Sequence, residues 1–292
     1  MRLLLTAATL AGLAVAQSAY VAQIEKWRQT REENLKKDDG WLTVAGLFWL
    51  RQGENSVGTG ESNQIVLPRG SAPSRVGVFF LEGEKARFVA ERGVPVSSSG
   101  KRVESLLLKS DTPGPPDVIT VEGLSMFVIK RGTRFGIRLR DMNSSFRREF
   151  TKLEWFPVNE AWRIQARFVP YNPPKQIPVL DIVGNTELQP CPGYAAFDIA
   201  GKSYRLEPVA EGDRLFFMFR DRTAGKETYP SGRFLYSDTP RDGRVILDFN
   251  RSYNPPCAFT PYATCPLPPR QNRLSVRIPA GEMVYHHSQS GK

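Results

Sequence analysis

The chain has 292 residues, of which 40% are apolar and 24% charged, a balance that excludes a disordered or fibrous protein. Lysine and arginine outnumber aspartate and glutamate by 40 to 30, but they are scattered rather than gathered in a run. This argues against nucleic-acid binding and favours a solvated basic surface.

The N-terminus has the pattern of a secretory signal. Arg2 precedes an apolar stretch, and small residues at Ala14 and Ala16 predict cleavage after Ala16. The stretch is short for a spanning helix, which needs about 20 apolar residues. We therefore expect a signal peptide at 1–16 and a secreted protein, extracellular or periplasmic, without a membrane span. An uncleaved anchor and a buried N-terminal helix are the alternatives.

The segment 20–37 has helical periodicity. Ile24, Trp27, Arg31 and Leu35 fall near one face at steps of three and four, and the opposite face is charged. Asp39 and Gly40 then end the pattern. The sequence predicts one amphipathic helix that packs its Trp27 side on the body of the protein.

From Trp41 onward the periodicity is that of strands. Short apolar runs recur about every ten residues, the spacing of an all-β sandwich or barrel. The expected strands are 42–50, 64–67, 77–81, 86–90, 94–96, 105–109, 118–121, 125–130 and 135–140, with turns at 53–55 and 58–60.

A second set of strands begins near Trp155. Apolar and basic residues alternate over 163–168, the pattern of an antiparallel strand with one buried face. The further expected strands are 194–200, 203–208, 215–219, 232–236, 245–250 and 273–278, of which 215–219 is apolar throughout and therefore central.

The predicted fold is mostly β, with two packed antiparallel units after one amphipathic helix. The first is a β-sandwich at 38–150. The second, a sheet or barrel-like unit at 151–287, contains a proline-rich loop at 254–269. One extended sheet system is the alternative.

Three cysteines are present, an odd number for an exported protein. Cys257 and Cys265 flank a short proline-filled loop and are the natural disulfide pair, which leaves Cys191 over. A reduced buried pair, or a reactive thiol or metal ligand, are the alternatives. We expect no metal site, because the only histidines, His286 and His287, lie near the C-terminus.

The segment 248–272 is the candidate functional site. Strand alternation places Asp248 and Asn250 on one face, beside a loop that six prolines stiffen. Arginines, amides and tyrosine hydroxyls together suit a small carboxylate or phosphate. The candidate ligand-binding residues are Arg220, Tyr229, Arg233, Tyr236, Asn250, Asn254, Tyr262 and Asn272. Alternatively, Asn and Asp beside prolines only satisfy loop backbone groups.

Several catalytic classes are disfavoured. The two histidines near the C-terminus argue against a Ser-His-Asp hydrolase, and no phosphate-binding or dinucleotide motif occurs. We predict no cofactor. Carboxylates remain as candidate bases, with Asp248 first, then Asp221 and Glu227.

Two long motifs carry a family resemblance. One is DGWLTVAGLFWL at 39–50, followed by Gly53-Glu54-Asn55; the other runs from Asp248 through NPPCAFTPYATCPLPP at 254–269 to Leu274. They resemble the domain-of-unknown-function family 1684 (DUF1684) over nearly the whole chain after the signal. The resemblance implies no established activity or cofactor.

The first half also resembles a forkhead-associated domain, through 53–58 and 63–67. Those domains bind phosphothreonine through an arginine after the glycine, where this chain has Thr59 after Gly58. The resemblance implies a sandwich without phosphopeptide binding.

Two functions compete. The first is binding, with conversion left open, of a small polar or anionic molecule at 248–272, with Asp248 as base or anchor and Arg233 holding negative charge. The second is a non-catalytic module that binds a protein or a surface polymer through the basic face of Arg163, Gln165 and Arg167.

Overall fold

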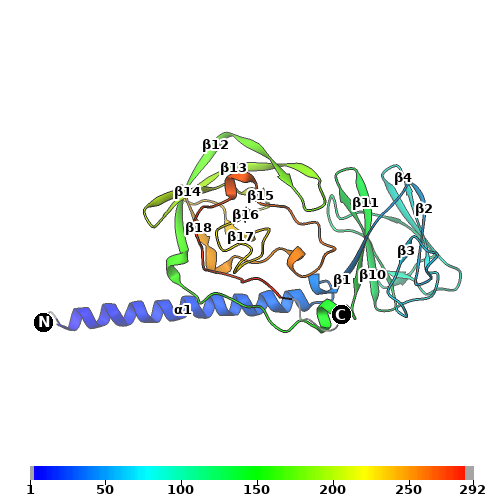
Figure 1. The fold of residues 1–292 in the computed structure, drawn as a ribbon, viewed down its shortest axis with the longest axis horizontal. Helices are drawn as coiled ribbons and strands as arrows, with labels where there is room; N and C mark the ends of the chain where they lie inside the picture. The colour runs from blue at the N-terminus through cyan, green and yellow to red at the C-terminus, as the bar shows by residue number, and fades with distance from the viewer. Residues whose placement is uncertain (1–2, 287–292) are drawn as a thin grey trace. The chain divides into compact units, whose positions relative to one another are not determined.

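The computed structural model describes residues 3–286, with side chains from residue 18 onward. The chain forms two compact units. We call Lys36–Phe150 with Thr260–Ala263 the sandwich unit, and Met1–Leu35, Thr151–Phe259 and Thr264–Lys292 the helix–sheet unit. Each unit contains two of the four sheets, so the described chain is not one extended sheet (Figure 1).

The sandwich unit has a six-stranded sheet in the order β1-β11-β10-β9-β6-β7 and a five-stranded sheet in the order β3-β2-β4-β5-β8. The strands are β1 Val44–Trp49, β2 Gly53–Gly58, β3 Ile65–Val66, β4 Gly77–Glu82, β5 Lys85–Ala90, β6 Ser97–Ser98, β7 Lys101–Arg102, β8 Ser105–Leu108, β9 Val118–Val121, β10 Leu124–Arg131 and β11 Arg134–Asp141. A 3-10 turn, Trp41–Thr43, precedes β1, and the short helix α2 is Ser145–Arg148.

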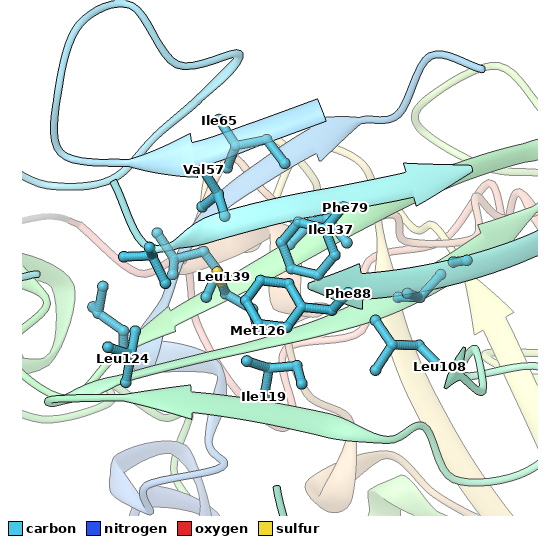
Figure 2. Close-up of a cluster of buried hydrophobic side chains, with 14 of the residues drawn as sticks. Val57, Ile65, Phe79, Phe88, Leu108, Ile119, Leu124, Met126, Ile137 and Leu139 are labelled. Atoms are coloured by element: carbon cyan, nitrogen blue, oxygen red, sulfur yellow. The ribbon is translucent and has the colours of Figure 1, made fainter. Parts of the chain in front are cut away.

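One apolar core joins the two sheets of the sandwich unit. Phe79 and Phe88 project from one sheet and meet Met126 and Ile137 from the other (Figure 2). All four side chains are fully buried. The short apolar runs that predicted these strands therefore also supply the residues that hold the sheets together.

Two local predictions in this unit are wrong. The segment 94–96 is no strand, because Val94 N–H bonds back to Glu91 in a turn and pairing starts at Ser97. The segment 53–55 is not a turn but the start of β2. Asn55 is buried there, and its amide is satisfied by donating to the carbonyl of Arg51 at 2.9 Å.

The helix–sheet unit starts with α1, Leu3–Lys36, where we expected a helix from residue 20 (Figure 1). Ile24 and Leu35 are buried, and the Trp27 ring lies 5.6 Å from that of Trp155. The predicted signal falls at residues whose side chains lie outside the described part. Within the described residues, no helix is both long and apolar enough to cross a membrane.

Seven strands follow in two antiparallel sheets, ordered β14-β13-β12-β18 and β15-β16-β17. They are β12 Arg163–Leu180, β13 Thr186–Ile199, β14 Lys202–Leu206, β15 Val209–Glu211, β16 Arg214–Phe219, β17 Arg233–Asp238 and β18 Arg244–Asp248. Phe168, Ala195 and Leu206 lie opposite one another and face the core, which β16 enters with Phe217. On β12 and β18, the residues that alternate with the core-facing ones therefore point to the other face of the four-stranded sheet.

The expected strands 245–250 and 273–278 need correction. β18 ends at Asp248, and the 3-10 turn Phe249–Arg251 follows, so Asn250 is not on a strand. Over 273–278 the chain forms only an isolated bridge at Arg273, although Leu274 and Ile278 are buried. Buried and exposed residues alternate there without the backbone pairing of a sheet, so a period-two pattern does not by itself imply a strand.

Candidate functional site

A cavity of about 680 Å³ lies in the helix–sheet unit, lined by α1 and by strands of both sheets. The helix contributes Trp27 and Arg31 to its wall, among others. Opposite them lie residues of the outward face of β12 and β18, together with the end of β17. The wall opposite α1 includes Arg163, Arg214, Tyr236, Asp238, Arg241, Arg244, Asp248, Arg251 and Tyr253.

The wall of this cavity is strongly basic. Its charged residues are the arginines 31, 163, 214, 241, 244 and 251 and the aspartates 238 and 248. Arg31 pairs with Glu282 at 3.4 Å and Arg251 with Asp248 at 3.6 Å. Among the described residues, the other four arginines have no ion pair. Asp238 stands opposite Arg214 on the neighbouring strand, so the wall carries an excess of positive over negative charge among the described residues.

Two tyrosines hold two of these arginines in place. The rings of Tyr236 and Tyr253 are stacked 6.4 Å apart at 13°. The Arg214 guanidinium lies 4.0 Å from the Tyr236 ring centroid, and that of Arg31 lies 4.7 Å from Tyr253. Burial raises the pKa of Tyr253 to about 12, so this ring stays neutral at physiological pH. Guanidinium groups held over aromatic faces are pre-oriented for a ligand.

Asp248 lies at this cavity, and one of its two carboxylate oxygens is bonded within the protein. Its Oδ1 accepts from Tyr20 Oη at 2.8 Å and from Asn250 N–H at 3.2 Å. Its Oδ2 faces Arg251 Nε at 3.6 Å. Burial, followed by the bond to Asp248, raises the pKa of Tyr20 well above its ordinary range. Through Tyr20, the carboxylate thus joins α1 to the end of β18.

Asn250 is fully buried and bonded inside the protein. Its Oδ1 accepts from Asn159 N–H at 3.0 Å, and its Nδ2 donates to the Asn159 carbonyl at 2.8 Å and to Tyr20 Oη at 3.0 Å. Asn250 therefore lies beside Asp248 as expected, but a 3-10 turn and not strand alternation places it there. Its contacts match the alternative in which such residues satisfy loop backbone groups.

Arg233 lies away from the cavity in a buried ion pair. Its Nη2 is 3.3 Å from Asp221 Oδ1 and 3.0 Å from the carbonyl of Ile278, and its Nη1 donates to the carbonyl of Ala280. Burial lowers the pKa of Arg233, and the charge of Asp221 opposes that shift. Both side chains are 1% exposed, so neither reaches a ligand in this structure.

Asn272 and Asn254 are fully buried as well. Asn272 Oδ1 accepts from Glu207 N–H at 2.8 Å, and its Nδ2 donates to the carbonyls of Glu207 and Met218. Asn254 Nδ2 donates to the Met283 carbonyl at 2.7 Å. Both amides thus bond to backbone groups of neighbouring segments.

The remaining predicted ligand-binding residues do not converge on one place. Arg220 is exposed, and its Nε donates to the Pro230 carbonyl at 2.9 Å. Tyr229 Oη donates to the Cys257 carbonyl at 3.2 Å. Tyr262 belongs to the sandwich unit. Of the predicted site residues, the structure therefore brings only Asp248 and Tyr236 to the cavity wall.

The described residues contain no disulfide. Cys257 N–H donates to Cys265 Sγ at 3.2 Å, so the expected pair is adjacent but in the thiol form. Burial raises the pKa of the Cys191 thiol to about 11, which makes it unreactive. Within the described part of the chain, no three His, Cys, Asp or Glu residues are grouped so that they could hold a metal ion.

The family described as "Protein of unknown function (DUF1684)" matches residues 148–283. An uncharacterised protein of Haloarcula marismortui, solved by NMR, is 31% identical over 47% of this chain and 78% of its own length, with a TM-score of 0.40. The chain belongs to the DUF1684 family. The DUF1684 match covers the cavity strands and the proline-rich loop, whereas the motif at 39–50 lies outside it.

Forkhead-associated domains are also among the similar structures. One, from a study of phosphothreonine-dependent interactions, is 19% identical over 32% of this chain and 92% of its own, with a TM-score of 0.24. The FhaA forkhead-associated domain is 19% identical over 32% of this chain and 97% of its own, also with a TM-score of 0.24. No curated protein matches this DUF1684 sequence.

The sequence prediction missed most of the basic wall. Arg31 and Arg214 lie on elements separated by more than a hundred residues, and only packing brings them together. One local signal was present. Arg241 and Arg244 flank Asp242-Gly243, a turn-forming pair that places the two arginines opposite each other.

Proposed function

We propose that the helix–sheet unit binds a small anionic molecule in the cavity beside α1. The observation that carries the proposal is the set of arginines 163, 214, 241 and 244, which line one cavity without an ion pair among the described residues. Like charges held close together destabilise a fold unless a counter-charge is present. A bound anion would supply that charge.

The size and chemistry of the cavity suit such a ligand. Small-molecule sites have volumes of roughly 300–1,000 Å³, a range that includes this cavity. Guanidinium groups form paired hydrogen bonds with the planar oxygens of a carboxylate or with a phosphate. Tyr236 and Tyr253 lie in the same wall and keep Arg214 and Arg31 over their rings.

Asp248 enters this proposal as an anchor and not as a base. Its Oδ1 already accepts bonds from Tyr20 and Asn250, and its Oδ2 faces Arg251. A general base needs a lone pair within reach of the substrate proton. We therefore propose that Asp248 holds the rim of the cavity in position.

Isothermal titration with glucuronate, citrate and inorganic phosphate tests the proposal. Wild-type protein should bind at least one of them, and the double variant R214A/R244A should bind it about tenfold more weakly. R222A/R270A is the matched control, because both arginines are exposed in the same unit and lie outside the cavity wall. Equal affinity in the two double variants, or no binding by wild type, would contradict the proposal.

We also propose that the chain is exported and that residues 1–16 are removed. Cleavage after Ala16 would keep Tyr20 and Trp27, which make the contacts between α1 and the strands. In an oxidising compartment Cys257 and Cys265 would then pair. N-terminal sequencing of the exported protein should start at Gln17, and a thiol titration in denaturant should find Cys191 alone. A start at Met1, or three thiols, would contradict this.

A further inference from the structure

A row of arginines crosses the outward face of the four-stranded sheet. Ala196 pairs with Arg205 on one side and with Arg167 on the other, and Arg167 pairs with Arg244. A bridge after β17 pairs Arg244 with Arg241. Residues directly opposite in antiparallel strands share a face. Arg205, Arg167, Arg244 and Arg241 therefore form one line, which we call the arginine row.

The arginine row is exposed and not neutralised. All four side chains are exposed, and none has an ion pair among the described residues. One acidic residue, Asp198, lies on the same face one step away, and it accepts a hydrogen bond from Ser203 at 2.6 Å. Like charges directly opposite each other on a sheet are unfavourable. Two such pairs, Arg167–Arg244 and Arg244–Arg241, occur in succession.

The row leads into the cavity. Arg244 and Arg241 line the cavity wall, whereas Arg167 and Arg205 lie beyond it on the same face. Neighbouring strands are about 4.8 Å apart, so the row extends over roughly 19 Å. A ligand of cavity size reaches only one end of it.

We infer that the ligand is a linear acidic polysaccharide, with one anionic sugar in the cavity and the following sugars along the arginine row. This inference rests on the proposed function, because the cavity holds the first sugar. Carboxylate or sulfate groups repeated along such a chain match guanidinium groups repeated across strands.

Other polyanions fit the row less well. Protein interfaces centre on exposed aromatic or apolar anchors, and the exposed large apolar residues of this unit, Leu180, Ile182 and Leu188, lie around the β12–β13 turn. Single-stranded nucleic acid stacks its bases on open aromatic rings. Between Arg205 and Arg167 the face carries only Ala196, and the Arg205 guanidinium lies 5.8 Å from the nearby Tyr194 ring centroid.

The test compares galacturonate with its trimer and hexamer by isothermal titration on the full chain. The hexamer should bind at least tenfold more tightly than the monomer, with a steeper loss of affinity as salt rises. R167A/R205A should weaken hexamer binding about tenfold and leave monomer binding unchanged. R222A/R270A should change neither. Thermal melting of each variant should match wild type, since all four arginines are exposed.

The two proposals fail in different measurements. Monomer binding that depends on Arg214 and Arg244, with no gain for the hexamer, would overturn the polysaccharide and retain the small anion. No monomer binding would overturn the placement of the first sugar in the cavity, and only the failure of glucuronate, citrate and phosphate as well would overturn the proposed function. Tighter binding of an oligothymidylate or of polyglutamate of equal charge would overturn the ligand class.

Discussion

Tyr20 and Asp248, 228 residues apart in sequence, are joined by a hydrogen bond of 2.8 Å from the phenol to the carboxylate. The same phenol oxygen accepts from Asn250 Nδ2 at 3.0 Å. One hydroxyl therefore connects α1 to the turn that follows β18, at the wall of the cavity. The helix takes part in forming the site as well as covering apolar surface.

We expect Y20F to lower the free energy of unfolding by about 1–3 kcal/mol. The change removes one hydrogen bond from a buried carboxylate and one from a buried amide, both of which keep their other partners. Y229F is the control, because that hydroxyl donates to a neutral carbonyl, of Cys257. Its effect should stay near 1 kcal/mol or below. Urea unfolding measures both, and an equal loss in the two variants would contradict the assignment.

Glu282 makes stability depend on pH. It is fully buried, and burial raises its pKa from the ordinary 4.5 to about 7, although Arg31 at 3.4 Å opposes the shift. Between these two pH values the folded protein holds a proton that the unfolded chain has released. The free energy of unfolding therefore falls as pH rises from 4.5 to 7, by up to about 3 kcal/mol.

E282Q should remove this pH dependence, because the amide resembles the protonated acid and does not ionise. From pH 4.5 to 7 the free energy of unfolding should fall in wild type more than in E282Q. The variant should therefore gain stability relative to wild type as the pH rises. E33Q, at an exposed position of α1, should follow wild type throughout. Parallel curves for wild type and E282Q in urea unfolding would show that Glu282 titrates normally.

The sequence predicted the fold class well because alternation is a local property. Phe168 was recognisable as inward-facing from the alternation of its neighbours alone, and it lies in a core. The predicted strand ends were wrong where a side chain competes with the backbone hydrogen bonds between strands. Asp248 accepts from Asn250 N–H and so starts a 3-10 turn, an effect of capping that periodicity does not register.

The candidate site was less predictable than the fold. Asp248 and Tyr236 were found because they lie on strands near an unusual segment. Arg31 was assigned to a helix face that packs on the body, and its position over Tyr253 depends on how α1 docks. Arg233 was taken as ligand-binding, but its partner Asp221 is brought to it only by the tertiary fold.

The Arg233–Asp221 pair should be essential for stability. R233M would leave Asp221 buried without its charge partner, and we expect a loss of about 3–5 kcal/mol. R277M breaks the exposed pair with Glu227 and should cost below about 1 kcal/mol. Guanidinium chloride unfolding of the two variants measures the contrast. Similar losses in both would mean that the buried pair contributes no more than a surface one.

Gly281 should tolerate no side chain. Its φ is +82°, and an added Cβ would lie 2.4 Å from the Ser252 carbonyl oxygen and 2.7 Å from that of Phe249. Both oxygens belong to the backbone next to the 3-10 turn after β18, so they cannot rotate away as a flexible side chain would. G281A should therefore suffer a steric clash in addition to backbone strain.

Gly225 separates these two effects, because it has the same φ of +82° with nothing within 4 Å of an added Cβ. G225A should cost about 1 kcal/mol from backbone strain alone. G281A should cost at least about 2 kcal/mol more, since overpacking adds to the strain. Urea unfolding of the two variants gives the difference directly. If G281A were no less stable than G225A, the turn after β18 would have to be looser than its hydrogen bonds indicate.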